Sequence, residues 1–264
     1  RYTRGAFWPA TLASFFVVTC VPLIRAYSSA LTEASLIFFG LTGMFLLSVY
    51  IKKQARIWLV VAALAIALAC LSRYVGVALI AGGAVALLLP GHKPLRARLF
   101  DVAVWGTVSG GPLAVWVGRN LTISGHVSRY ATQVDVVGTD RISRYVDMAI
   151  QDVFAWSLPD RVPLEFRLAA FAVLVLFLVG VSAALLRRRR QKPDENLLPG
   201  ELRALPLVLI ICGVAYCAFI VGTIALVQQG TLSARFMALI YVIAFILLAC
   251  WFYRLTNLFR SAQT

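Results

Sequence analysis

The sequence predicts an all-α, polytopic transmembrane helix bundle of about eight spans, and composition is the first reason. Of its 264 residues, 61% are hydrophobic and 14% are charged, and the mean hydropathy is +0.86. An average soluble domain has about 25% charged residues. A helix needs about 17–25 apolar residues to cross a hydrocarbon layer of roughly 30 Å, and eight runs approach that length. These runs are 7–24, 31–51, 57–72, 74–90, 99–118, 166–186, 204–228 and 235–254.

The basic residues predict the orientation of these runs. The formal net charge is +14, and if the chain starts in the cytoplasm, sixteen of its 25 Lys and Arg residues fall on the cytoplasmic side. Such an excess is typical of cytoplasmic loops, and "LLRRRRQK" at 185–192 is its strongest mark. We therefore expect a multi-pass integral membrane protein with both termini of this chain in the cytoplasm. The arginine run is interpreted as an orientation signal and not as a nucleic-acid site.

All eight runs form a single transmembrane domain, 1–264, with two long connections. The cytoplasmic loop 187–203 is charged and interrupted by prolines. The extracytoplasmic loop 119–165 has apolar residues at helical spacing over 141–156. This spacing predicts an amphipathic helix, which either lies flat on the membrane surface or packs on its neighbours within an ordinary loop.

Two local signals predict how neighbouring helices meet. The link 71–76 between two runs is so short that it predicts a tight helical hairpin. Gly106 and Gly110 have the small-xxx-small spacing that lets two helices approach closely. Pro112 follows them and favours a bend in the same helix.

The cysteines and histidines indicate little chemistry. All five cysteines fall inside apolar runs and are interpreted as small buried hydrophobic residues. The two histidines, His92 and His126, are predicted on opposite sides of the membrane, so nothing in the sequence requires a metal or another cofactor. The chain begins with Arg1 and has no signal peptide, from which we expect a fragment of a longer protein.

Polar residues that are costly at membrane depth gather at the extracytoplasmic boundary, whereas the cytoplasmic boundary is expected to carry only dispersed cations. They come from four predicted spans and are Glu33, Arg73, Tyr74, Arg119, Asn120 and Arg235. Ionisable groups in such places usually face a bundle interior, where they pair with one another or with a ligand. Because the arginine fork suits phosphate, the expected ligand is a lipid-linked phosphate.

Each of these residues also has a purely structural explanation. An arginine can extend to the phosphates of lipid headgroups. Glu33 stands in the first turn of a predicted helix, where a carboxylate suits the helix dipole. Tyr74 is an ordinary interface aromatic residue, and Asn120 begins a glycosylation sequon. The collection of several such residues at one depth is what favours a binding site.

Four stretches of the chain resemble a known family, in the family's order and over nearly the whole length. They are "SSALTEASLIFFGLTGMFLL" (28–47), "ALACLSRYVGVALIAGGAVALLL" (67–89), "PLAVWVGRNLTISG" (112–125) and "SARFMALIYVIAFILLA" (233–249). In these stretches the chain is similar to the C-type polytopic membrane glycosyltransferases, and more narrowly to bacterial relatives of protein mannosyltransferases and of the lipid A aminoarabinose transferase. Short family motifs match Thr32–Glu33, Ser72–Tyr74, Arg119–Asn120 and Arg235, with Phe236 in place of a tyrosine.

The resemblance implies transfer of a sugar from a polyprenyl-phosphate donor to a lipid, protein or glycan acceptor outside the cytoplasm, in a bacterial inner membrane. It implies that the arginines stabilise the departing phosphate and that Glu33 orients an arginine or a sugar hydroxyl. Relatives carry their catalytic acid in a first outer loop that is not recognisable here, so we expect that residue outside this chain. Some relatives use a divalent metal ion.

The sequence also bears on two other functions. A non-catalytic transmembrane scaffold or assembly subunit of a larger membrane complex is the alternative to the transferase. A transporter would instead predict polar residues in mid-membrane and paired repeats, and neither is clear in the sequence.

Overall fold

In the computed structural model, the described part of the chain is built of helices. It comprises residues 31–89, 93–125, 204–226 and 234–260, with scattered positions between 11 and 23 and between 162 and 176. The elements are α3 (Leu31–Lys53), α4 (Arg56–Ser72), the 3-10 turn η1 (Tyr74–Gly76), α5 (Val77–Leu88), α6 (Leu95–Ser124), α9 (Leu205–Leu226) and α10 (Ala234–Arg260). No strand occurs among these residues.

Several of these helices suit a membrane. Three are long and apolar enough to cross one, namely Thr32–Lys53, Leu95–Ser124 and Leu205–Thr223, and three shorter apolar helices span Arg56–Ser72, Tyr74–Leu88 and Met237–Trp251. The chain is therefore a membrane protein, and six of its predicted spans overlap described helices. The number of spans stays a prediction. The spans 7–24 and 166–186 are described only at scattered positions, and the helix over 141–156 and the loop 187–203 lie outside the described residues.

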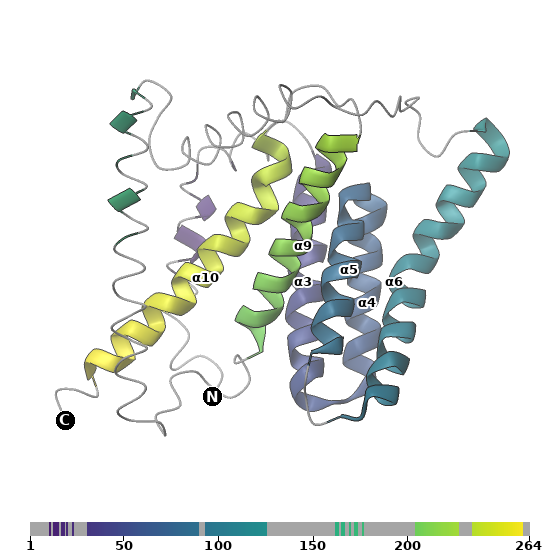
Figure 1. The fold of residues 1–264 in the computed structure, drawn as a ribbon, viewed down its shortest axis with the longest axis horizontal. Coiled ribbons are helices and arrows are strands. Elements are labelled where there is room, and N and C mark those ends of the chain that lie inside the picture. Colours follow the sequence, from purple (N-terminus) through teal and green to yellow (C-terminus); the bar gives the residue numbers. More distant parts are fainter. Residues whose placement is uncertain are drawn as a thin grey trace.

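The helices form a bundle with two inclined members. Helices α3, α4, α5 and α9 stand side by side, α6 flanks them on one side, and α10 crosses obliquely on the other (Figure 1). Helix α4 packs on α3 and α6, α5 packs on α6 and α9, and α10 packs on α9 and α3. We call the end of the bundle where α3 begins and α4 ends the Glu33 end, and the opposite end the Lys93 end.

The hairpin between α4 and α5 is as tight as predicted. Arg73 is the single residue between α4 and η1, and its backbone is extended, with φ −152° and ψ 132°. Gly76 then turns the chain against α4: a Cβ on Gly76 would lie 2.9 Å from the Cα and N atoms of Cys70. Only a residue without a Cβ allows this close return of the backbone.

Helix α5 makes its closest contacts through two adjacent glycines. A Cβ on Gly82 would lie 2.8 Å from the Cα of Cys212 in α9, and a Cβ on Gly83 would overlap the indole of Trp105 in α6. The Trp105 Nε1 also donates a hydrogen bond of 2.9 Å to the carbonyl of Ile80. Small residues at helix interfaces let backbones approach in this way, so Gly82 and Gly83 join α5 to both neighbours.

The spacing of Gly106 and Gly110 predicts a close helix contact, and no such contact occurs among the described residues. Among the residues that the structure describes, nothing lies within 4 Å of a Cβ built on Gly106, and at Gly110 only Ile80 comes that near, at 3.9 Å. Each of these glycines directly follows a fully buried residue, Trp105 or Ser109. One residue advances the helix by about 100°, so the two glycines point away from the face of α6 that packs.

Helix α6 is longer than predicted. It continues through Pro112 to Ser124 and ends at Gly125, whose φ of 70° is left-handed. The predicted loop therefore does not begin at residue 119, and its first residues are helical, because no glycine or proline lies between residue 119 and Gly125. The Thr122 and Ser124 hydroxyls each donate a 2.8 Å hydrogen bond to a carbonyl of the helix itself.

The half of α6 that contains Gly110 to Ser124 leaves the bundle. The buried residues of α6 as a whole are Asp101, Trp105 and Ser109, and all three lie in the other half, nearer the Lys93 end. Figure 1 shows α6 leaning away from its neighbours toward the Glu33 end. Val115, 74% exposed, and Ile123, 69% exposed, are apolar residues of this part, which suits contact with lipid tails.

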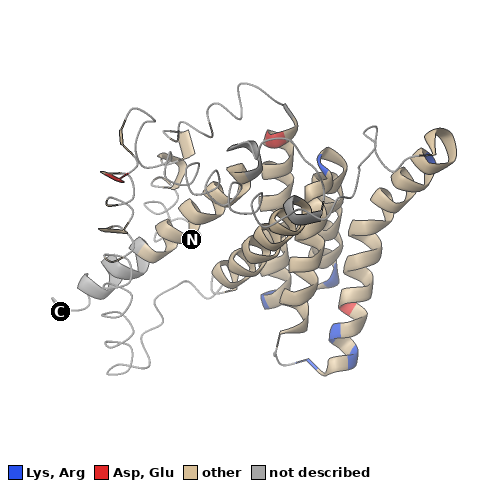
Figure 2. Cartoon of the chain, turned by 45° about the horizontal axis from the view of Figure 1, so that its top comes forward, with Lys and Arg blue, Asp and Glu red and all other residues tan. Residues whose placement is uncertain are grey.

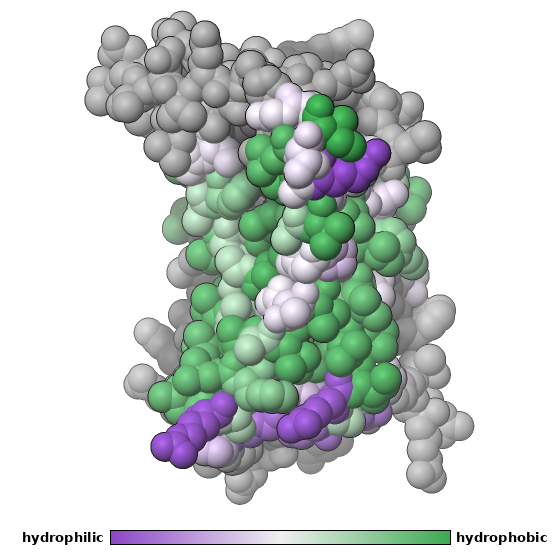
Figure 3. Space-filling view, turned by 90° about the vertical axis from the view of Figure 1, so that its right-hand side faces the viewer, coloured by the Kyte–Doolittle hydropathy of each residue, from purple (hydrophilic) through white to green (hydrophobic). Residues whose placement is uncertain are grey.

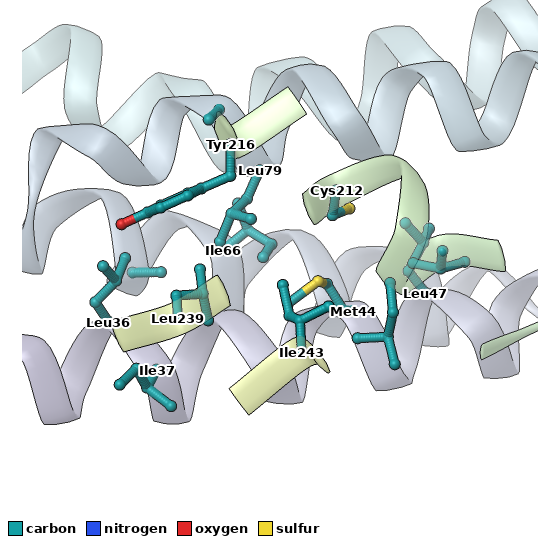
Figure 4. Close-up of a cluster of buried hydrophobic side chains, with 14 of the residues drawn as sticks. Leu36, Ile37, Met44, Leu47, Ile66, Leu79, Cys212, Tyr216, Leu239 and Ile243 are labelled. Carbon is teal, nitrogen blue, oxygen red and sulfur yellow. The ribbon is translucent and has the colours of Figure 1, made fainter. Parts of the chain in front are cut away.

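Apolar side chains from five helices fill the centre of the bundle. Figure 4 shows Leu36, Met44 and Leu47 of α3 facing Leu239 and Ile243 of α10, with Ile66, Leu79, Cys212 and Tyr216 beside them. Lipid tails are as apolar as these side chains, so close packing, and not exclusion of water, is what favours their association. Cys20, Cys70 and Cys212 are buried as predicted, whereas Cys217 is exposed on α9.

The surface has an apolar belt between charged ends. The face that includes α6 is largely hydrophobic over its middle and hydrophilic at both ends (Figure 3). Basic residues gather at the Lys93 end, where α3 ends and α4 and α6 begin (Figure 2). They are Lys52, Lys53, Arg56, Arg96 and Arg98. A belt of this kind matches the hydrocarbon layer of a bilayer.

Candidate functional site

A buried ion pair lies at the Glu33 end. The Arg73 guanidinium donates from one terminal nitrogen to Oε1 of Glu33, and the Thr32 hydroxyl donates to Oε2 at 3.1 Å. The Glu33 side chain is 3% exposed and that of Arg73 is 21% exposed. The pair joins the first turn of α3 to the α4–η1 link, so the structure brings together two residues that are forty positions apart in sequence.

The partial exposure of Arg73 is what makes this pair a candidate site. A buried carboxylate without a partner is costly, and Glu33 therefore holds the guanidinium in place. A guanidinium has five N–H donors in a planar fork, which suits a phosphate as well as a carboxylate. The pair thus offers a positioned cation at one end of the bundle.

Tyr216 is a third polar group near this pair, and sequence reasoning missed it. It is fully buried on α9, its hydroxyl has no hydrogen-bond partner among the described residues, and it interacts electrostatically with both Arg73 and Glu33. Figure 4 shows the hydroxyl pointing toward the side of the cluster where Leu36 lies, which is the Glu33 end. A tyrosine inside the apolar run 204–228 was a usable signal, because a buried phenol usually has a hydrogen-bond partner.

Tyr74 and Arg119 meet on the same end of the bundle through an aromatic residue. The indole Nε1 of Trp116 donates to the Tyr74 hydroxyl at 2.9 Å, and the Arg119 guanidinium lies 5.8 Å from the centre of the Trp116 ring. The contact ties the outward-leaning half of α6 to η1. Arg119 therefore stacks on Trp116, and the described contacts do not include one between Arg119 and Glu33.

The other predicted site residues are placed less fully. Asn120 follows Arg119 on α6 and is partly exposed, and its backbone carbonyl accepts the Ser124 hydroxyl. Arg235 lies in the first turn of α10, and its side chain is outside the described part of the structure.

The Lys93 end contains a second polar cluster, which contradicts the prediction of dispersed cations there. Lys93 Nζ donates to Asp101 Oδ2 and to the Tyr50 hydroxyl, both at 2.7 Å. Asp101 is 5% exposed and Tyr50 is 1% exposed. Arg98 Nε also donates to the Lys93 carbonyl at 2.9 Å. The cluster ties the link between α5 and α6 to the end of α3, and the buried Asp101 and Tyr50 both pair with Lys93, which indicates a structural role.

Asp101→Asn is expected to lower the free energy of unfolding by about 1 kcal/mol, because it weakens the charged hydrogen bond from Lys93. The expected loss is small because Lys93 is partly exposed to solvent, which screens the charge. Burial lowers the pKa of Lys93, but hydrogen bonds to Asp101 and Tyr50 raise it more. A lysine whose pKa is raised on folding contributes its full stabilisation of the folded protein below about pH 10.4. This contribution is lost as the pH rises through the raised pKa. When unfolding is measured in detergent, the free energy of unfolding should therefore fall less at alkaline pH in Asp101→Asn than in the native protein. An equal fall in both proteins would contradict this prediction.

Groups of three or more His, Cys, Asp or Glu that could hold a metal do not occur within the described ranges. Arginine and tyrosine side chains can instead bind an anion through N–H and O–H donors. Comparison with protein-family models matches none to this chain, and comparisons with curated proteins and with solved structures find no match. The function must therefore be argued from the residues of the site.

Proposed function

We propose that this membrane protein is a glycosyltransferase, or part of one, that transfers a sugar from a polyprenyl-phosphate donor to a lipid, protein or glycan acceptor. In this proposal the Glu33 end faces the extracytoplasmic side of a bacterial inner membrane, and the basic residues of the Lys93 end face the cytoplasm. The substrate-binding residues are Glu33, Arg73, Tyr74, Arg119, Asn120 and Arg235.

One observation carries the proposal, namely the partly exposed Arg73 held by the buried Glu33. A lipid phosphate enters from the membrane with its charge at headgroup level, which is where such an arginine can pair with it. Arg119 adds a second cation at the same end, stacked on Trp116. Residues at this depth usually pair with each other or with a ligand.

The chemistry assigns different roles to the charged groups. When the sugar leaves, negative charge develops on the lipid phosphate, and a guanidinium already in position stabilises it. The acceptor hydroxyl needs a general base. Glu33 is not assigned this role, because its carboxylate is paired with Arg73 and buried; the family resemblance implies an acid in a loop outside this chain.

A specific observation favours a second candidate, a non-catalytic scaffold subunit. Within the described structure, nothing lies within 4 Å of a Cβ at Gly111 or Gly118, which stand seven residues apart on the same face of α6. Small residues on an open face suit a partner transmembrane helix. Binding measurements on the donor separate this function from the first, because a scaffold does not require Arg73 to bind phosphate.

Arg73→Lys is expected to weaken binding of a polyprenyl-phosphate sugar about tenfold, because lysine keeps the charge but loses the planar fork. Arg235→Ala should weaken it as well. The matched control is Arg56→Lys at the Lys93 end, where Arg56 lies 5.1 Å from the Phe100 ring, and binding should be unchanged there. Binding is measured by fluorescence titration in detergent, with the neutral polyprenol as a second control. Unchanged donor binding in both Arg73→Lys and Arg235→Ala would overturn the proposal.

A further inference from the structure

Two buried groups at the Glu33 end have complementary needs. The Tyr216 hydroxyl is fully buried and has no hydrogen-bond partner among the described residues. Glu33 is equally buried, and its charge is compensated by Arg73. A buried donor without an acceptor is unfavourable, and so is a buried carboxylate whose cation has been drawn away.

Binding of a phosphate would change this balance. A phosphate competes with Glu33 for the Arg73 guanidinium, because both are anions that suit its fork. As Arg73 turns toward the phosphate, Glu33 keeps only the Thr32 hydroxyl of the partners described here. The Tyr216 hydroxyl already points toward this end of the bundle and is close enough to interact electrostatically with both charged groups.

We propose that Tyr216 is the exchange partner of Glu33: when a phosphate takes Arg73, the phenol O–H donates a hydrogen bond to the Glu33 carboxylate. The inference rests on the proposed function only in that Arg73 binds phosphate. Tyr216 is a positioning residue, since it acts through Glu33 and need not touch the ligand. The exchange keeps both buried groups paired when phosphate is bound; without phosphate, the phenol has no hydrogen-bond partner among the described residues.

Tyr216→Phe separates this role from a structural one, because it removes only the hydroxyl. The melting temperature of the variant without phosphate should be unchanged or higher, since the lost hydroxyl has no partner among the described residues. Affinity for polyprenyl phosphate in detergent micelles should fall about tenfold, as for loss of a hydrogen bond to a charged group. Titration with inorganic phosphate shows whether the headgroup alone drives the exchange, and the neutral polyprenol should not respond to the substitution.

Tyr50→Phe is the matched control. Tyr50 is also a buried phenol, but it accepts a hydrogen bond from Lys93 at the opposite end. This variant should therefore melt at a lower temperature and bind phosphate normally, the reverse of the pattern expected for Tyr216→Phe. A lower melting temperature of ligand-free Tyr216→Phe with normal phosphate affinity would overturn the proposal.

A double-mutant cycle with Glu33→Gln decides the remaining outcomes. If Tyr216 acts through the Glu33 charge, Tyr216→Phe should weaken phosphate binding much less in the Glu33→Gln background than in the native one. Equal losses in both backgrounds overturn the exchange. Arg73→Lys distinguishes the two proposals: if it weakens binding while Tyr216→Phe does not, only the exchange fails, and if it has no effect, the phosphate site itself fails.

Discussion

Arg73→Ala is expected to lower the free energy of unfolding by about 3–5 kcal/mol, because breaking a buried ion pair from one side leaves an uncompensated charge. Glu33, 3% exposed, keeps only the Thr32 hydroxyl among its described partners in this variant. The loss should appear in chemical unfolding in mixed detergent micelles, followed by far-UV circular dichroism. It should be much larger than the effect of Arg56→Ala, a cation over the Phe100 ring at the other end.

The double variant Glu33→Ala/Arg73→Ala tests the cause. Removing both charges also removes the desolvation cost of the pair, so the double variant should be more stable than Arg73→Ala alone. Glu33→Ala alone should cost less than Arg73→Ala, because the remaining guanidinium is more exposed than the carboxylate. If the double variant were as unstable as the sum of the two single losses, the pair would not account for the effect of Arg73.

Gly83→Ala should have the second large effect, a loss of about 1–3 kcal/mol from overpacking. A methyl group there would overlap the Trp105 indole, a rigid ring that is 1% exposed and bonded to the Ile80 carbonyl. The ring cannot yield without losing this bond or separating α5 from α6. Thermal unfolding of the purified protein in detergent measures the loss.

Gly106→Ala is the matched control for Gly83→Ala. Alanine favours a helix by up to about 1 kcal/mol over glycine, and a Cβ at Gly106 meets no described atom within 4 Å. This variant should therefore be as stable as the native protein or more so. Equal destabilisation at Gly83 and Gly106 would contradict the way in which the structure turns α6 against α5.

The contrast between these glycines shows where prediction from sequence fails. In a membrane bundle the lipid-facing and core-facing sides of a helix are both apolar, so hydropathy does not reveal which face packs. Gly106 and Gly110 have the spacing of a packing motif, yet Trp105 and Ser109 occupy the buried face of α6. The rotation of a helix about its axis depends on its neighbours, which are distant in sequence.

Some polar groups could be placed from the sequence and others could not. Glu33 and Arg73 could be predicted to lie at one boundary, because each is an ionisable residue at the end of an apolar run. That they pair with each other was shown by the structure. Tyr216 and Asp101 could not be placed, because one stands inside an apolar run and the other near the start of one. Their burial, and the partners they have or lack, follow from contacts between helices.

The sequence by itself determined that the chain is helical, that it belongs in a membrane and where most described helices lie. Length and apolarity suffice for this, because a chain in lipid must satisfy its backbone hydrogen bonds within each helix. Only the tertiary structure decided which glycines join helices, which way α6 leans and which side chains meet at each end. Those features depend on packing between distant segments, and no local property of the chain encodes them.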